Sequence, residues 1–110
     1  MNSAAHGRIV IVLTTLGADA DAAALAETLV TERLAACVNV LPVMTSVYRW
    51  KEKIERDREQ QIVIKTTADR LEALEARLLA LHPYDVPEFL IVPVESASAA
   101  YRDWLLGSVE

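Results

Sequence analysis

Hydrophobic positions in the first part of the chain recur at strand spacing and then at helix spacing. Residues 9–13 form an unbroken apolar run, which is typical of a strand buried on both faces. A helix-spaced series follows, and Asp19 or Asp21 is placed to cap its start. The members of that series are Ala22, Leu25, Ala26, Leu29 and Arg33. This pattern predicts a buried strand followed by an amphipathic helix.

The last part of the chain predicts a second helix, a final strand and a short closing helix. Thr66 or Thr67 is placed to cap the second helix, which carries leucines at helical spacing. Those leucines are Leu71, Leu74, Leu78 and Leu81. Residues 89–94 predict the final strand, and residues 98–106 predict the closing helix. The side chains expected on one side of that helix are Tyr101, Trp104 and Leu105.

Between the two helices lie two long runs rich in β-branched and aromatic residues, residues 36–49 and residues 54–66. The polar tip between them, residues 50–53, predicts a hairpin turn. A ribbon of ~13 residues a side would reach about 40 Å, whereas a domain of this length has a radius of gyration of about 13 Å. Because such a ribbon overhangs its own subunit and leaves open edges, we expect an obligate oligomer.

A weak internal repeat supports a fold built from two similar halves. Residues 10–15 (VIVLTT) resemble residues 62–67 (IVIKTT), and a predicted helix follows each copy. Two strand–helix–strand halves in tandem predict an α+β, ferredoxin-like βαββαβ sandwich. Lys65 stands where the first copy has Leu13. It lies either at a sheet edge with its ammonium in solvent, or at a subunit interface facing a carboxylate or a bound anion.

Composition favours a single cytoplasmic domain. We expect residues 1–7 to be a disordered tail and residues 8–110 to form one domain of this 110-residue chain. No apolar run is long enough for a membrane span or a secretory signal. The single cysteine, Cys37, has no internal disulfide partner and is expected to be a buried structural residue. The net charge of −5 argues against binding to nucleic acid.

Candidate metal ligands are few. The two histidines are His6, in the expected tail, and His82. His82 with Glu88, completed by Cys37 or by a carboxylate of another subunit, would make a partial metal site. Alternatively, His82 ends a helix before Pro83, where the helix dipole favours it. The chain also lacks a nucleophile beside a histidine and a phosphate-binding glycine loop, so we expect no enzymatic activity.

Five blocks of sequence together resemble the CutA divalent-cation-tolerance family. They are LAACVNV (residues 34–40), SVYRW (46–50), IKT (64–66), HPYDVPE (82–88) and YRDWL (101–105). The resemblance extends from Arg8 to Leu106 in one order and at ordinary spacing. It implies a trimer of ferredoxin-like subunits, similar in architecture to nitrogen-regulatory signal-transduction proteins. It also implies binding of copper or other divalent ions.

The chain departs from the family pattern at three positions. Some members have a cysteine where this chain has Thr14 and a histidine where it has Leu81, and both have been linked to copper. Of that set only His82 remains here. Many members have glycine where this chain has Glu52, so a turn that needs a positive φ there would be strained.

The resemblance also groups residues that are far apart in sequence. Two prolines stiffen residues 83–88, either as a plain connector or to hold Tyr84 and Glu88 in place. With Trp50, Glu59 and Lys65, these two residues would line a cleft between subunits that suits a small polar or anionic ligand. The aromatic residues expected to pack at the trimer interface are Tyr48, Trp50 and Trp104.

Three functions are therefore open at this point. The first is a cytoplasmic, homotrimeric divalent-cation tolerance protein that binds Cu²⁺ or another divalent ion. The second is a trimeric small-ligand sensor or adaptor in which metal binding is incidental. The third is a structural anchor that recruits partners by its surface. Neither nucleic acid nor a membrane is expected among the partners.

Overall fold

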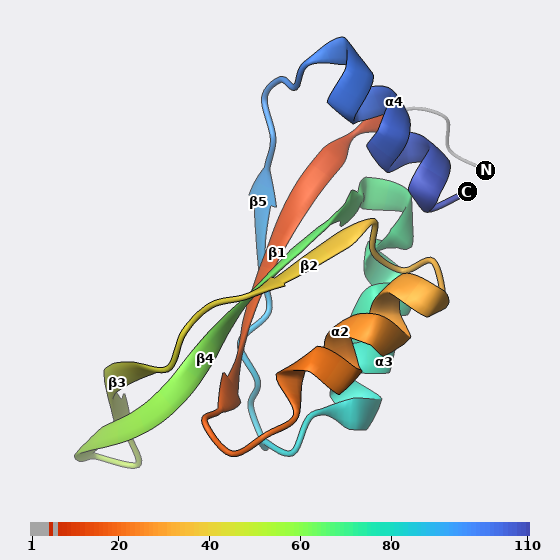
Figure 1. Cartoon of the computed structure of the whole chain (residues 1–110). Helices are drawn as coiled ribbons and strands as arrows, with labels where there is room; N and C mark the ends of the chain where they lie inside the picture. The colour runs from red at the N-terminus through yellow and green to blue at the C-terminus, as the bar shows by residue number, and fades with distance from the viewer. Residues whose placement is uncertain (1–4, 6) are drawn as a thin grey trace.

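The computed structural model describes Ala5 and residues 7–110, and in this part of the chain five strands form one antiparallel sheet (Figure 1). The strands are β1 (Ile9–Gly17), β2 (Cys37–Val40), β3 (Met44–Trp50), β4 (Lys53–Thr67) and β5 (Leu90–Pro93). Four follow the order β2-β4-β1-β5, and β3 pairs with the far end of β4. The predicted disordered tail falls mostly outside the described residues, which leave out residues 1–4 and His6.

Helices pack on one face of this sheet and at one end of it. They are α2 (Ala22–Thr31), α3 (Leu71–Leu81), which follows a 3₁₀ turn (Ala68–Arg70), and α4 (Ala99–Ser108). The core between the sheet and the first two helices contains Val12, Leu29, Ile62, Ile64 and Leu74, all with no exposed surface. This confirms the predicted mixture of an antiparallel sheet and helices. Among the described residues, no helix is both long and apolar enough to cross a membrane.

The start of α2 was predicted correctly, whereas its end was not. Asp21 caps the helix by accepting a hydrogen bond from the Ala24 backbone N–H at 3.0 Å. Arg33, expected inside the helix, lies beyond its end with φ of 60°. The backbone N–H of Leu34 then donates to the Leu29 carbonyl at 3.0 Å, which closes the helix in a Schellman arrangement. Arg33 therefore occupies the left-handed position that glycine usually fills.

The predicted cap of the second helix is wrong. The Thr66 hydroxyl donates to the Leu34 carbonyl at 2.8 Å, so it ties β4 to the segment after α2. The Thr67 hydroxyl donates to the Asp69 carboxylate within the 3₁₀ turn and caps no backbone N–H. These partners come from segments that the local sequence pattern does not reveal.

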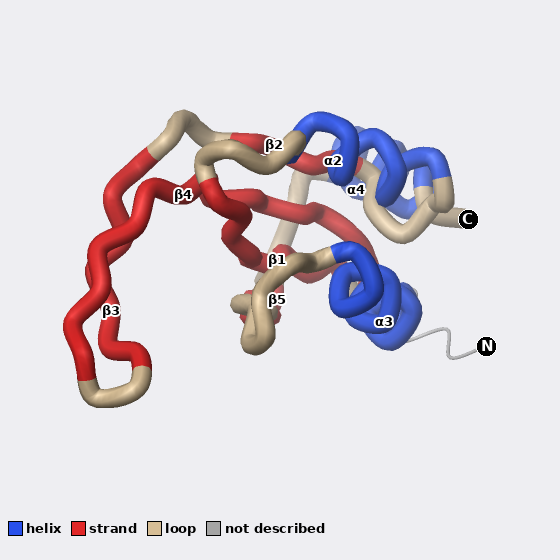
Figure 2. The backbone as a smooth tube through the Cα atoms, turned by 90° about the horizontal axis from the view of Figure 1, so that it is seen from below, coloured by secondary structure: helices blue, strands red, loops and turns tan. Residues whose placement is uncertain are grey.

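The predicted first arm of the ribbon is not continuous. Val40 pairs with Ile62 and Met44 with Glu59, so residues 41–43 face only two residues of β4. One extra residue in this edge segment makes a β-bulge, and Pro42 within it has no N–H to donate. Beyond this bulge the β3–β4 ribbon leaves the body of the molecule, as Figures 1 and 2 show. The longest dimension of the chain is 44 Å, against 26 and 25 Å for the others.

The tip of the ribbon was predicted correctly. Trp50 pairs with Lys53, which leaves a two-residue turn. Lys51 and Glu52 have φ values of 49° and 70°, as a type I′ turn requires. Both residues carry a Cβ in the left-handed region, so the strain anticipated at Glu52 is present and Lys51 shares it.

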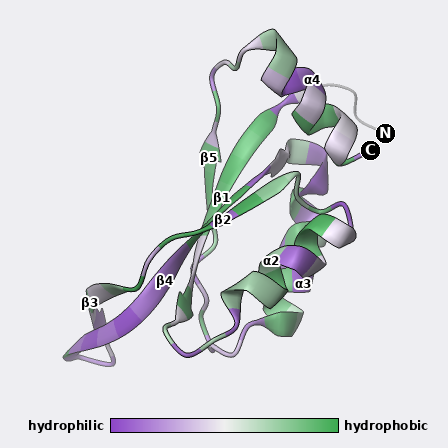
Figure 3. Ribbon diagram, in the orientation of Figure 1, coloured by the Kyte–Doolittle hydropathy of each residue, from purple (hydrophilic) through white to green (hydrophobic). Residues whose placement is uncertain are grey.

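The sheet face opposite α2 and α3 is apolar and incompletely covered. Strand pairing aligns Ile11 and Leu13 with Val63 and Lys65 on this face. Leu90 and Val92 of β5 continue it, with 54% and 42% of their surface exposed. Figure 3 shows the hydrophobic body beside a largely hydrophilic ribbon. Within the described chain, nothing packs over much of this apolar face.

Lys65 lies in the middle of the sheet. It pairs with Ile11 of β1 on one side and with Cys37 of β2 on the other. The edge position considered from the sequence is therefore wrong, because β2 occupies the outer side of β4 at this point. The half-buried Lys65 side chain emerges on the incompletely covered apolar face.

Candidate functional site

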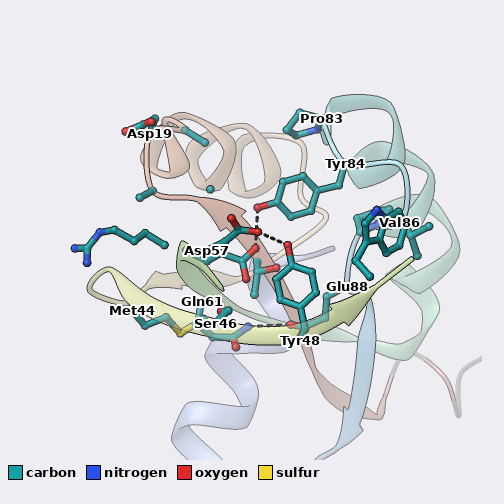
Figure 4. Close-up of a pocket in the computed structure, with 18 of the residues that line it drawn as sticks. Asp19, Met44, Ser46, Tyr48, Asp57, Gln61, Pro83, Tyr84, Val86 and Glu88 are labelled. Atoms are coloured by element: carbon teal, nitrogen blue, oxygen red, sulfur yellow. Dashed lines mark hydrogen bonds between the residues drawn. The ribbon is translucent and has the colours of Figure 1, made fainter. Parts of the chain in front are cut away.

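A groove with a volume of about 1250 Å³ lies along the base of the ribbon (Figure 4). One wall is a face of the ribbon, the floor is the end of β1 with the loop after it, and the other wall is the loop between α3 and β5. Its lining includes Thr15, Gly17, Asp19, Met44, Ser46, Tyr48, Trp50, Asp57, Arg58, Glu59, Gln61, Tyr84, Asp85, Val86 and Glu88. The groove therefore joins three segments that are distant in sequence.

Strand alternation explains how the ribbon supplies its wall. Side chains two apart on a strand point to the same face. The residues that face the groove are Met44, Ser46, Tyr48 and Trp50 of β3 and Asp57, Glu59 and Gln61 of β4. The pairing of Met44 with Glu59 keeps the two series on one side of the ribbon.

Two phenol–carboxylate pairs occupy the centre of the groove. The Tyr84 hydroxyl donates to Glu59 Oε2 at 2.7 Å, and the Tyr48 hydroxyl donates to Asp57 Oδ2 (Figure 4). Burial of Tyr84, together with its bond to Glu59, raises the pKa of that phenol. The bond to Asp57 raises the pKa of Tyr48 to about 12. Both phenols therefore stay protonated at neutral pH and donate to the carboxylates.

Glu59 is a buried carboxylate in an acidic groove. Only 6% of its surface is exposed, and among the described residues it is the one buried side chain that carries a charge. It forms no ion pair within that part of the chain. The groove lining contains five carboxylates, including Glu59, and one guanidinium, that of Arg58. A buried charge normally has a charged partner, so this arrangement favours a cation in the groove.

The loop between α3 and β5 is fastened to the sheet through Gln61. Its amide nitrogen Nε2 donates to Glu88 Oε2 at 3.0 Å and to the Thr14 carbonyl at 2.7 Å. This places one oxygen of the Glu88 carboxylate against β4. Pro83 and Pro87 restrict the backbone of this loop between His82 and Glu88. The loop therefore holds Tyr84 and Glu88 at defined positions in the groove wall.

His82 serves the same loop and uses both of its ring nitrogens within the chain. Its Nδ1 accepts a hydrogen bond from the Tyr84 backbone N–H at 3.1 Å. Its Nε2 lies 2.6 Å from the Thr15 carbonyl and so carries the proton that bonds to it. The ring also contacts the Tyr84 ring, with centroids 4.7 Å apart. With these partners, neither nitrogen offers a free lone pair to a metal ion.

The described residues of one chain do not fit a copper site at His82. In this part of the molecule, no group of three or more His, Cys, Asp or Glu side chains is arranged to hold a metal ion. Thr14, which replaces a family cysteine, has a buried hydroxyl with no hydrogen-bond partner among these residues. A metal ion at His82 would have to displace the bonds to Thr15 and Tyr84.

The structure brings together most of the residues that the sequence grouped in a cleft. Trp50, Glu59, Tyr84 and Glu88 line the same groove. Lys65 does not line it: it lies six residues from Glu59 along β4, which corresponds to about 20 Å. The cationic end of the expected cleft is therefore missing from the groove of a single chain.

Of the three aromatic residues expected at a trimer interface, Tyr48 and Trp50 line the groove. Trp104 lies on α4 beside Tyr101, with ring centroids 5.3 Å apart. The bond between Tyr48 and Asp57, and the role of Gln61, were not anticipated. Counting alternate positions outward from the turn would have placed all three of these residues on the same face as Glu59.

Known proteins resemble the chain over almost its whole length. A family model described as CutA1 divalent ion tolerance protein matches residues 10–108. The divalent-cation tolerance protein CutA of Thermus thermophilus is 43% identical over 95 residues, which span 86% of this chain and 92% of that protein. This relative is named as a tolerance protein and not as an enzyme.

Solved structures agree with the sequence match. A divalent cation tolerance protein from Thermus thermophilus superposes with a TM-score of 0.88 at 40% identity, covering 93% of this chain and 99% of the other. A structure of CutA from Synechococcus elongatus complexed with a Bis-Tris molecule has a TM-score of 0.84 at 42% identity, covering 92% and 93%. From these matches and from its fold, the chain belongs to the CutA1 divalent ion tolerance protein family.

Proposed function

We propose that the chain is a cation-binding divalent-cation tolerance protein that acts as a homotrimer of ferredoxin-like subunits, with the acidic groove as its binding site. One observation carries the binding proposal: Glu59 is buried and charged and has no cationic partner among the described residues. An ion or ligand of positive charge in the groove would offset the cost of desolvating this carboxylate. Divalent ions such as Cu²⁺ are the ligands that the family name suggests.

Three features support the trimer. The ribbon extends beyond the body, and the apolar face carrying Leu90 and Val92 is incompletely covered. In the described chain β5 also pairs only with β1, so one of its edges is open. A second copy would cover these surfaces.

The strand order β2-β4-β1-β5, with α2 and α3 on one face, is the arrangement of a ferredoxin-like sandwich and supports that part of the proposal.

Calorimetric titration with Cu²⁺ tests the binding proposal. We expect the wild type to give a saturable heat that Glu59→Gln weakens, because the amide keeps its acceptor for Tyr84 but loses the charge. Glu75→Gln, an exposed change of the same charge on α3, is the matched control and should titrate like the wild type. Equal heats for Glu59→Gln and the control would count against the groove as the cation site.

The same titration decides the role of His82. We propose that His82 positions Tyr84 and is not a ligand, because both of its nitrogens bond within the chain. If His82→Ala abolishes the copper heat while Glu59→Gln leaves it intact, the ion binds at His82, with Glu88 as the neighbouring carboxylate. That outcome would move the site out of the acidic groove.

Sedimentation tests the assembly. We expect a trimer at micromolar concentration, and a well-folded monomer there would refute the trimer. A cytoplasmic location belongs to the same proposal, and it is supported by the lone Cys37, which has no internal disulfide partner. A fluorescent fusion expressed in the native host would show whether this location is correct.

A trimeric small-ligand sensor or adaptor is the second candidate. The groove is larger than a bare ion needs, and Trp50, Tyr48 and Tyr84 line it. The related protein from Synechococcus elongatus is complexed with Bis-Tris, an amine that carries several hydroxyl groups. The expectation of an anionic ligand rested on Lys65, which lies outside the groove. A rise in melting temperature with a defined metabolite, in the absence of metal, would favour this function.

A further inference from the structure

We propose that the groove binds an organic diammonium ion of the 1,4-diaminobutane class, held between the carboxylates of Asp57 and Glu59. This inference rests on the proposed cation-binding function and specifies the chemical class of the ligand. It follows from the free carboxylate oxygens, from the spacing of the two residues along β4 and from the phenol rings beside them.

Each of the two carboxylates has one oxygen engaged and one free. Tyr84 donates to Glu59 Oε2, and Tyr48 donates to Asp57 Oδ2. The other oxygens, Glu59 Oε1 and Asp57 Oδ1, accept no hydrogen bond within the described residues. Because the phenols stay protonated, they hold the carboxylates in place while the free oxygens remain available to N–H donors.

The spacing of the two carboxylates suits a short diamine. Asp57 and Glu59 are two residues apart on one face of β4, so their backbone positions lie roughly 6.6 Å apart. Two ammonium groups joined by four methylene groups span about this distance when extended. One ammonium can therefore lie beside each carboxylate, with the methylene chain between them along the ribbon.

Aromatic side chains around the carboxylates suit the same ligand. Tyr48 is 40% exposed and Tyr84 is 37% exposed, so both of the phenol rings that bond to these carboxylates keep accessible surface in the groove. Aromatic faces attract ammonium ions and also cover methylene groups.

Other ligands fit these features less well. A bare metal ion needs several ligands in one shell, and because the described residues of one chain contain no group of three suitable side chains, it would need further ligands from another subunit or from water. An anion would face five carboxylates with only Arg58 to oppose them. A neutral diol would leave the charge of Glu59 uncompensated. A diammonium ion matches both the charge and the shape.

Calorimetric titration of the full chain with 1,4-diaminobutane tests the inference, and butane-1,4-diol serves as the uncharged ligand of the same length. We expect saturable binding of the diamine and none of the diol. Glu59→Gln and Asp57→Asn should each raise the Kd about ten- to a hundredfold, since each removes a charge-assisted hydrogen bond. Glu75→Gln should leave the Kd unchanged. Asp57→Asn carries the test if Glu59→Gln fails to fold.

The outcomes separate this inference from the proposed function. A diamine heat that Glu59→Gln and Asp57→Asn do not weaken, or equal binding of the diol, would overturn the inference. A copper heat that depends on Glu59, with no diamine heat, would also overturn it but leave the proposed cation site standing. Saturable heats from neither copper nor the diamine would overturn both.

Discussion

Tyr84→Phe tests the energetic role of the phenol that holds Glu59. The change removes one hydroxyl and keeps the ring, including its contact with His82. A hydrogen bond to a charged group contributes about 1.5–3 kcal/mol. Because Tyr84 is 37% exposed, water replaces part of that bond, and we expect a loss of about 1–2 kcal/mol per chain. Urea unfolding at fixed protein concentration measures this loss as a lower midpoint at an unchanged slope.

Tyr101→Phe is the matched control for this prediction. Within the described residues the Tyr101 hydroxyl makes no hydrogen bond, so its removal should change stability by less than about 0.5 kcal/mol. A double variant with Glu59→Gln should lose less than the sum of the two single changes, because Glu59→Gln already weakens, by loss of the charge, the bond that Tyr84→Phe removes. If Tyr84→Phe is as stable as Tyr101→Phe, the argument that this bond supports a buried charge is wrong.

Three further predictions concern the fold and its pH dependence. Arg33→Gly should raise the free energy of unfolding in urea by about 0.5–1 kcal/mol per chain, because glycine removes a left-handed backbone cost that exceeds the entropy it adds to the unfolded chain. An equal gain from Arg33→Ala would contradict this reasoning. The pKa of Tyr48 is raised from 10.0 to about 12, so the folded state keeps a proton that the unfolded state loses. Stability should therefore fall as pH rises from about 10 to about 12, and urea midpoints in Tyr48→Phe should fall less. Leu105→Ala should lower the free energy of unfolding by about 2–5 kcal/mol and speed amide hydrogen exchange in α4, because the Leu105 side chain is only 1% exposed. Unchanged amide exchange would mean that burial of Leu105 does not hold α4 in place.

The sequence pattern predicted an element correctly wherever the residues of one short segment determine its structure. The apolar run of residues 9–13 became part of β1, and Asp21 caps α2 as its position before the apolar series suggested. The tip at residues 50–53 followed from its polar composition between two β-rich runs. The two copies of the internal repeat also pair with each other, with Val12 opposite Ile64.

Features that depend on a distant partner could not be derived in this way. Thr66 bonds to Leu34, and Lys65 is flanked by β2, so both of their roles depend on strand pairing. The groove was anticipated only in part: Glu59 and Tyr84 were named, but their direct bond requires the α3–β5 loop to fold back onto β4. The engagement of both His82 nitrogens likewise depends on Thr15, which is far away in sequence.

The bulge at residues 41–43 sets the direction of the ribbon that forms one wall of the groove. Loss of one codon there would let the segment join a regular ladder and leave the pairing of Met44 with Glu59 as it is. The ladder would be straighter, however, because bulges bend and twist the strand that contains them. The arm would then swing relative to the loop that carries Tyr84. Small insertions and deletions at residues 41–43 can therefore reshape the groove while every side chain that lines it is inherited unchanged.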